Sequence, residues 1–257
     1  MRGFNLWRRG SAALPLVISL FAAICAAAQT TNGLSGAEIQ GRKLAQQLCD
    51  SRPAENFTNK GVLQIRVGSG KRLESSLRVE TVTNSNNWEA RYSATFADKD
   101  LFQYALTVTH SSEQPNIYHS TEENVAGHFE KVLLGNKTMT SFAGSDFWIC
   151  DLGLEFFHWP GQKILKKENR RGRGCMVLES VNPEPSTNSY SRVVSWIDEE
   201  SGGIVQAEAY DFKKKLLKEF APKSFKKVNG QWELKDMEID NVQTRSRTWL
   251  VFDLKAK

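Results

Sequence analysis

The chain has 257 residues and a formal net charge of +5, from 34 lysine and arginine residues against 29 aspartate and glutamate residues. Residues 1–28 hold three of the arginines and no acid, so the charge of the remaining chain is about +2. A near-balanced chain lacks the concentrated basic face that nucleic-acid binding needs, and this class of partner is therefore excluded. The remaining roughly 230 residues suffice for one large all-β domain or two small ones.

The N-terminus has the pattern of a secretory signal peptide. Three arginines form a basic region, an apolar stretch follows over residues 12–23, and Ala26-Ala27-Ala28 fits the small-x-small rule of the signal peptidase. A membrane anchor is the alternative, because the uncharged stretch is just long enough to span a bilayer, but no stop-transfer charges follow it. We therefore expect a cleaved signal peptide over residues 1–28, export to the periplasm, and a single domain over residues 29–257.

The first part of the exported chain predicts a helix and then strands. Ser35-Gly36-Ala37-Glu38 is a capping box, and the helix predicted over residues 36–50 has one apolar and one polar face. Strands are predicted over residues 61–67 and 72–83, with a glycine-containing turn between them.

Apolar and polar residues alternate most clearly over residues 88–96. This alternation places aromatic rings on one face, and a strand over residues 101–110 continues the stripe. Its aromatic residues are Trp88, Tyr92, Phe96, Phe102 and Tyr104. Such a stripe belongs either to the hydrophobic core or to a ligand pocket, and the residues alone leave both readings open. Weaker strand patterns follow at residues 116–120, 128–134 and 137–142.

Residues 144–160 break the alternation. Ser145 or Asp146 can cap a short helix, and Pro160 ends the segment. The segment is too apolar for a solvated loop, so it fills a core or lines a pocket. We expect a short helical lid whose ligand contacts come from Phe147, Trp148, Leu152, Phe156, Phe157 and Trp159. A hairpin follows it, with strands over residues 164–169 and 175–180.

The C-terminal part repeats a short alternating run and a tight polar turn. The four runs cover residues 193–197, 204–210, 231–239 and 247–252. Glycine or Asn-Gly between runs supplies the positive φ that closes hairpins, so the pattern predicts an antiparallel meander whose apolar face carries large aromatic residues. The lysine-rich segments 213–215 and 223–227 are interpreted as polar faces and turns.

The motifs favour binding over catalysis. The sequence has no Gly-x-Ser-x-Gly elbow, no His-Glu-x-x-His motif and no phosphate-cradling glycine loop. Its histidines are not paired at ligand spacing and it has no Cys-x-x-Cys, so we expect neither a metal nor a cofactor. Cys150 and Cys175 are the preferred candidates for a disulfide in an oxidising compartment, and burial of Cys49, Cys150 and Cys175 as free thiols is the alternative.

Several short motifs together resemble the LolA-like outer-membrane lipoprotein-sorting family over residues 60 to 255. They are Gly144-Ser145-Asp146-Phe147, Asp151-Leu152, Arg192 to Asp198, Tyr210-Asp211, Leu216 to Phe220 and Phe225 to Trp232. The resemblance implies a periplasmic half-barrel, in which a curved antiparallel sheet of about ten or eleven strands is closed on its concave side by helices. It also implies that the sheet holds acyl chains or a lipidated N-terminus.

Two functions from different classes remain. The first is a monomeric periplasmic carrier of phospholipid or lipoprotein acyl chains, which exchanges its ligand with a membrane-associated transporter or receptor. The second is a periplasmic module for protein interaction or regulation, whose sheet is filled by its own side chains.

Overall fold

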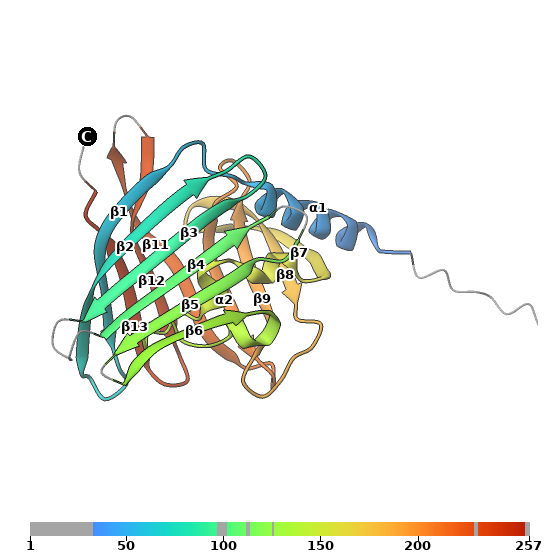
Figure 1. Ribbon diagram of the computed structural model, residues 1–257. Helices are drawn as coiled ribbons and strands as arrows, with labels where there is room; N and C mark the ends of the chain where they lie inside the picture. Colours follow the sequence, from blue (N-terminus) through green and yellow to red (C-terminus); the bar gives the residue numbers. More distant parts are fainter. Residues whose placement is uncertain (1–32, 97–101, 112–113, 125, 229–230, 255–257) are drawn as a thin grey trace, which may run out of the picture. The chain divides into compact units, whose positions relative to one another are not determined.

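The computed structural model describes residues 33–96, 102–111, 114–124, 126–228 and 231–254, so the predicted signal peptide lies outside the described residues. Leu34–Lys257 forms one compact unit. Its described strands form a single antiparallel sheet of thirteen strands in the order β6-β5-β4-β3-β2-β1-β13-β12-β11-β10-β9-β8-β7. The sheet curves without closing, because β6 and β7 lie at its two edges (Figure 1).

The first six strands form one wing of the sheet, each pairing with the next along the chain. They are β1 (Phe57–Arg66), β2 (Arg72–Thr83), β3 (Trp88–Phe96), β4 (Phe102–His110), β5 (Ile117–Asn124) and β6 (Gly127–Leu133). The other wing holds β7 (Gly161–Arg170), β8 (Arg173–Val181), β9 (Tyr190–Asp198), β10 (Ile204–Asp211), β11 (Leu216–Val228), β12 (Gln231–Asn241) and β13 (Ser246–Phe252). Pairing of β1 with β13, for example Leu63 opposite Leu250, joins the two wings.

The main hydrophobic core lies on the concave side of the sheet. Alternation along β2 buries Ser75, Leu77, Val79 and Thr81 on this side, as period-two geometry requires. The segment between β6 and β7 contributes the short helices η1 (Gly135–Thr138), α2 (Ile149–Leu152) and η2 (Glu155–His158). Figure 1 shows α2 in the space that the curved sheet surrounds.

The helix α1 (Gly36–Asp50) agrees with the prediction at both ends. Ser35 and Glu38 form the predicted capping box, with Ser35 N donating to Glu38 Oε2 at 2.7 Å and Glu38 N to Ser35 Oγ at 3.3 Å. Its inner face buries Gly41, Leu44 and Ala45 and packs on the edge strand β7. The close approach of α1 to β7 is made at a glycine, because Gly41 has no Cβ to hold the two backbones apart.

The strand count of ten or eleven is wrong, since the described residues contain thirteen. The alternation of apolar and polar residues did not predict β11, because its lysines and Pro222 are typical of turns. Pro222 is tolerated because β11 pairs with β10 only as far as Phe220, and a bulge follows Pro222 in the pairing with β12. The strand predicted over residues 137–142 is also wrong. This segment begins in η1 and then makes only one isolated bridge, from Ser141 to Trp148.

Two further predictions about local structure need correction. The predicted short helix is α2, but neither Ser145 nor Asp146 caps it; the carboxylate of Asp151 accepts a hydrogen bond from Trp148 N at 2.8 Å instead. In the C-terminal meander, Trp196 lies in a second cluster with Cys175, Val177 and Val194, separate from the main core. The concave side of β9 carries Tyr190, Val193 and Ile197, and Trp196 is not part of it.

Candidate functional site

The predicted lid and the residues before it pack against the concave side of the sheet. We call residues 139–160 the plug segment. A tight turn begins it, in which Phe142 N donates to Phe147 O at 2.8 Å, and Ala143 and Gly144 both have positive φ. The segment then contacts strands from both wings of the sheet, through Tyr92 of β3 and Tyr190 of β9.

Most of the ligand contacts predicted for the lid are buried in the core. Phe147, Leu152, Phe156, Phe157 and Trp159 are all buried, and only Trp148 is half-buried. The ring of Phe156, 1% exposed, lies 4.6 Å from that of Phe157 and 6.4 Å from those of Trp159 and Phe220. These rings are therefore packed on the concave side of the sheet.

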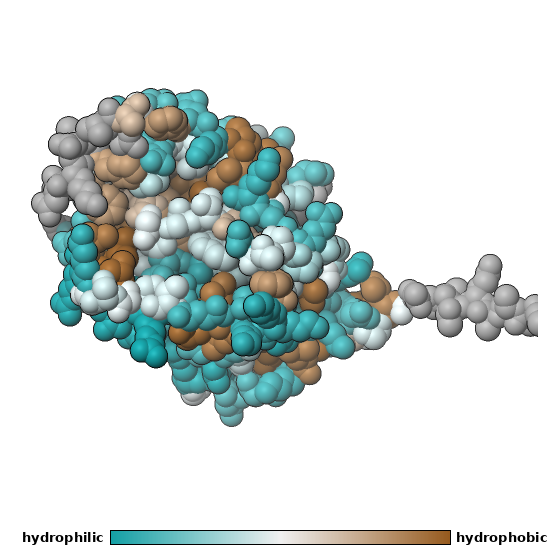
Figure 2. Space-filling model, turned by 90° about the horizontal axis from the view of Figure 1, so that it is seen from below, coloured by the Kyte–Doolittle hydropathy of each residue, from teal (hydrophilic) through white to brown (hydrophobic). Residues whose placement is uncertain are grey.

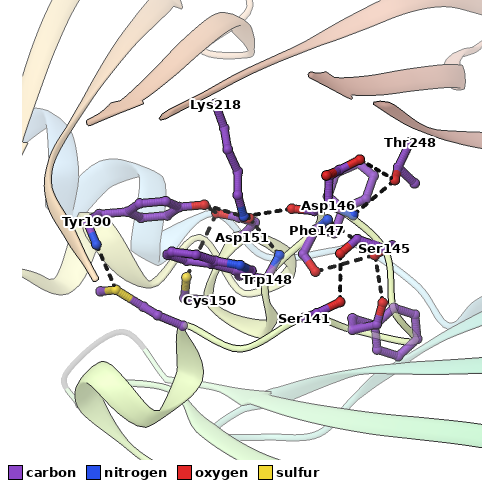
Figure 3. A network of polar contacts seen from close by, with 12 residues as sticks. Ser141, Ser145, Asp146, Phe147, Trp148, Cys150, Asp151, Tyr190, Lys218 and Thr248 are labelled. Carbon is purple, nitrogen blue, oxygen red and sulfur yellow. Dashed lines mark hydrogen bonds and ion pairs between the residues drawn. The ribbon is translucent and has the colours of Figure 1, made fainter. Parts of the chain in front are cut away.

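A buried network of charged and polar groups fixes the plug segment to the wing formed by β7 to β13 (Figure 3). Lys218 of β11 is 1% exposed; its Nζ donates to the carbonyl of Asp146 at 2.7 Å and lies 3.7 Å from Asp151 Oδ2. The Tyr190 hydroxyl lies 3.0 Å from both carboxylate oxygens of Asp151, to which it donates. The Lys218 ammonium also sits 3.7 Å from the centroid of the Trp148 ring, a cation–π contact.

Burial sets the ionisation of this pair. It lowers the pKa of Lys218 to about 8, with the Asp151 carboxylate opposing the shift. It raises the pKa of Asp151, while Lys218, the Trp148 amide and the Tyr190 hydroxyl favour the charged form. Each charge is thus held in the core by its partner, because an unpaired buried ion is strongly unfavourable.

The carboxylate of Asp146 makes a second attachment, to the last strand. The Thr248 hydroxyl donates to Asp146 Oδ2 at 2.9 Å, and the Ser246 hydroxyl donates to Asp146 Oδ1. Asp146 and Asp151 therefore hold the plug segment against β11 and β13, on the wing opposite the aromatic stripe.

The far end of the plug segment is bound to β5. The Tyr118 hydroxyl donates to Glu155 Oε2 at 3.0 Å, and Asn116 Nδ2 donates to the carbonyl of Gly153 at 2.8 Å. Burial raises the pKa of Glu155 to about 7, although the hydrogen bonds from Tyr118 and Asn116 oppose the shift. This carboxyl is consequently half protonated near neutral pH.

The predicted aromatic stripe lies on the concave face of β3 and β4, and its residues have different roles. The Tyr92 hydroxyl donates to the Leu152 carbonyl of the plug segment at 3.2 Å, and burial raises its pKa to about 12. Trp88 stacks on His110 with ring centroids 3.8 Å apart. These two members of the stripe are therefore engaged within the protein.

The other three members of the stripe lie close to one another. Phe96 is paired with Phe102, whose ring packs edge-on against Tyr104 at 4.6 Å, and all three are half-buried. They lie at the end of the sheet where β3 ends and β4 begins. Seen from below, the molecule shows hydrophobic residues in several small groups among hydrophilic ones (Figure 2). Of the predicted ligand contacts, the five residues of the stripe and Trp148 are half-buried and so retain surface that a ligand can cover.

A separate pocket of about 260 Å³ lies between α1 and the end of the plug segment. Its lining includes Arg42, Cys49, Phe157, His158 and Trp159. Cys49 Sγ lies 3.8 Å from His158 Nδ1, but burial raises the pKa of Cys49 to about 12, so the thiol stays protonated. The pocket does not contain an activated nucleophile.

The candidate disulfide between Cys150 and Cys175 is not formed, and both thiols are free. Cys150 belongs to the concave core, whereas Cys175 belongs to the second cluster, with Trp196. Sequence separation by a hairpin did not reveal that the two side chains belong to different clusters.

Among the described residues no group of three or more His, Cys, Asp or Glu side chains could hold a metal ion. No helix within the described ranges is long and apolar enough to cross a bilayer.

Solved structures with the same architecture decide the fold. An outer-membrane lipoprotein-sorting protein domain from Vibrio parahaemolyticus matches with a TM-score of 0.68 at 20% identity, over 84% of this chain and 92% of that one. A LolA superfamily protein from Nitrosomonas europaea matches with a TM-score of 0.58 at 12% identity, over 87% and 94%. The chain has a LolA-like fold.

Another structure with this LolA-like fold is a DUF1329 family protein from Desulfovibrio piger, with a TM-score of 0.66 at 21% identity over 87% of this chain and 96% of that one. A family model described only as an uncharacterized protein matches residues 130–254. Comparison with curated proteins gave no match. The resemblance inferred from the sequence motifs is thus confirmed at the level of fold.

Within the LolA-like fold, sequence reasoning missed the residues that hold the plug segment. Lys218, Tyr190 and Thr248 were not named as site residues, nor were Tyr118 and Glu155. One signal was available: Lys218 and Phe220 are two positions apart and so share a face of β11, and an inward-facing lysine needs a buried acid.

Proposed function

We propose that the protein binds the acyl chains of lipids or lipoproteins on the concave side of its sheet and carries them without chemical change. The observation that carries the proposal is the group of half-buried rings of Phe96, Phe102 and Tyr104 at one end of the concave face. A structural neighbour named for outer-membrane lipoprotein sorting supports it through the shared fold.

The geometry supports a ligand position between the stripe and the plug segment. The ring of Phe142 in the plug segment lies 6.1 Å from that of Tyr92 and 6.4 Å from that of Tyr104. An acyl chain entering beside Phe102 would cover the exposed parts of these rings, at roughly 25 cal/mol per Å² of apolar surface. Longer chains need the plug segment to shift, since its aromatic residues fill the space beyond.

The proposed setting is the periplasm, reached through the signal peptide predicted over residues 1–28. A carrier of this kind receives its ligand from one membrane-associated partner and passes it to another, as a monomer. Neither step needs a cofactor or a catalytic residue.

A second function is favoured by a different observation. The plug segment already buries Phe147 and Phe156, and its acids Asp146 and Asp151 have polar partners. A concave side filled by the chain's own residues suits a periplasmic module that binds protein partners or regulates signalling, with no lipid inside.

Mass spectrometry of organic extracts distinguishes the two functions. The protein is purified from the cell envelope without detergent, and extracted lipid is quantified against protein. A carrier yields phospholipid or acylated peptide in a fixed ratio and takes up an added fluorescent fatty acid, which unlabelled lipid displaces. Absence of both extracted lipid and displaceable binding would reject the carrier and leave the interaction module.

A further inference from the structure

The ends of β11 and β12 extend beyond their neighbours in the sheet. Pairing of β12 with β13 begins only at Asp236, and pairing of β11 with β10 extends only to Phe220. Residues 225–228 and 231–234 consequently pair only with each other in the described part of the chain. We call these two stretches the overhang; they project at the upper left of Figure 1.

One face of the overhang is aromatic and basic. Phe225 is opposite Leu234, and Lys227 is opposite Trp232. Directly opposite residues of an antiparallel pair point to the same side, and positions two apart along a strand share that side. Phe225, Lys227, Trp232 and Leu234 therefore lie on a common face.

This face is turned to solvent. The side chain of Trp232 is 71% exposed and that of Phe225 is 55% exposed. On the opposite face of the overhang, Val228 is buried and Lys226 Nζ donates to the carbonyl of Leu254. Two large aromatic rings thus stay in water while the residues behind them are anchored.

The charge around these rings favours an anionic partner. Lys227 lies on this face with no acid beside it on the face, and Lys235 at the border of the overhang is exposed. The single acid of the overhang, Glu233, lies on the opposite face together with Lys226, and Lys223 is paired with Glu238 at 2.8 Å. Indole rings concentrate at the water–lipid interface of membranes, and lysine can lay its alkyl stem along apolar surface while its ammonium reaches phosphate. The face has four residues, which is too small for a stable protein interface but enough for reversible membrane contact.

We propose that the overhang docks the protein on an anionic phospholipid surface, with Trp232 and Phe225 inserted among the headgroups and Lys227 against lipid phosphate. The docking does not require a lipid in the concave side, so it goes beyond the carrier function.

The test is co-sedimentation of the purified full chain with vesicles. Phosphatidylcholine vesicles are compared with vesicles of phosphatidylcholine and phosphatidylglycerol. We expect binding to the mixed vesicles that falls with added salt and is about tenfold weaker on phosphatidylcholine alone. Phe225→Ser with Trp232→Ser, or Lys227→Glu alone, lowers binding about tenfold or more. Equal binding to both vesicle types, or wild-type binding by these variants, would overturn the proposal.

Phe212→Ser is the matched control, because Phe212 is exposed beside Lys213 near the other end of β11. It leaves vesicle binding unchanged, and an equal loss in this variant would show that the overhang has no special role. Fluorescence gives a second readout: brominated lipid quenches the wild-type tryptophans and quenches Trp232→Phe much less. Thermal melts confirm that each variant is folded, and the lipid content of the same preparations shows separately whether the carrier function holds.

Discussion

Lys218 Nζ lies 3.7 Å from Asp151 Oδ2, and both side chains are almost completely buried on the concave side of the sheet. The contact joins the start of β11 to the helix α2, which are far apart in the sequence. Burial disfavours each charge by itself, and the ion pair and its hydrogen bonds favour the charged forms. Attachment of the plug segment therefore depends on electrostatics as well as on apolar packing.

Removing one partner of this pair should destabilise the protein strongly. Lys218→Met leaves the Asp151 carboxylate unpaired in the core, and we expect a loss of about 3–5 kcal/mol in the free energy of unfolding. The double variant Lys218→Met with Asp151→Asn should lose less than the sum of the single changes, since no charge is left unpaired. Urea denaturation measures all three. Arg78→Met, which breaks the exposed pair with Glu80, is the control and costs under about 1 kcal/mol; an equally small loss for Lys218→Met would contradict the role of the network.

Local signals predicted much of the fold. The helix α1 follows from a capping box, and the bounds of β2 and β3 follow from alternation between turns. The strand β11 was not predicted, because its lysines and Pro222 locally favour turns. Its position between β10 and β12 in the sheet overrides that preference. The partners of Pro222 lie in β12, so the bulge that accommodates it depends on a contact outside the segment.

The candidate site was harder to predict, because the sequence pattern shows that aromatic rings are buried but not whether they face the core or a ligand pocket. The motif around Asp146 and Asp151 was recognised, yet its purpose depends on Lys218, 67 positions beyond Asp151 in the printed sequence. The faces of the C-terminal strands were also mistaken, since Trp196 is covered by the Arg170 guanidinium, 4.5 Å from its ring, rather than by the main core. A stacked cation lets a large aromatic ring be buried outside the main core.

The stability of the protein should change with pH through Glu155. Its pKa rises from 4.5 to about 7 on folding, so the stabilisation from the protonated form is complete below about pH 4.5 and is lost as the pH rises through 7. Glu155→Gln mimics the protonated carboxyl and should gain up to about 2–3 kcal/mol relative to wild type between pH 5 and pH 8. Thermal or urea unfolding at several pH values gives the difference curve. A flat curve for Glu155→Gln would show that this carboxyl does not titrate with folding.

Residues at the open end of the concave side should affect ligand retention, whereas residues in its core should mainly affect stability. Phe96→Ala with Phe102→Ala removes half-buried rings at the open end, and we expect loss of co-purifying lipid with a stability cost under about 2 kcal/mol per residue. Phe156→Ala creates a cavity in the core and should cost about 3–5 kcal/mol. Lipid per protein is measured by mass spectrometry and stability by urea denaturation. Full lipid retention in the folded Phe96/Phe102 variant would place the ligand elsewhere.

The packing of α1 on β7 should depend on one glycine. A Cβ at Gly41 would lie 2.5 Å from Lys163 N and 2.6 Å from Lys163 Cα, and these backbone atoms cannot rotate away. Gly41→Ala should therefore cost about 1–3 kcal/mol, although alanine favours helix by about 1 kcal/mol over glycine. Amide hydrogen exchange should quicken in α1 as the helix separates from the sheet. Gly36→Ala is the control in the same helix, because nothing lies within 4 Å of its added Cβ, and it should be neutral or slightly stabilising. Equal stability of the two variants would mean that α1 is not pressed against β7 at Gly41.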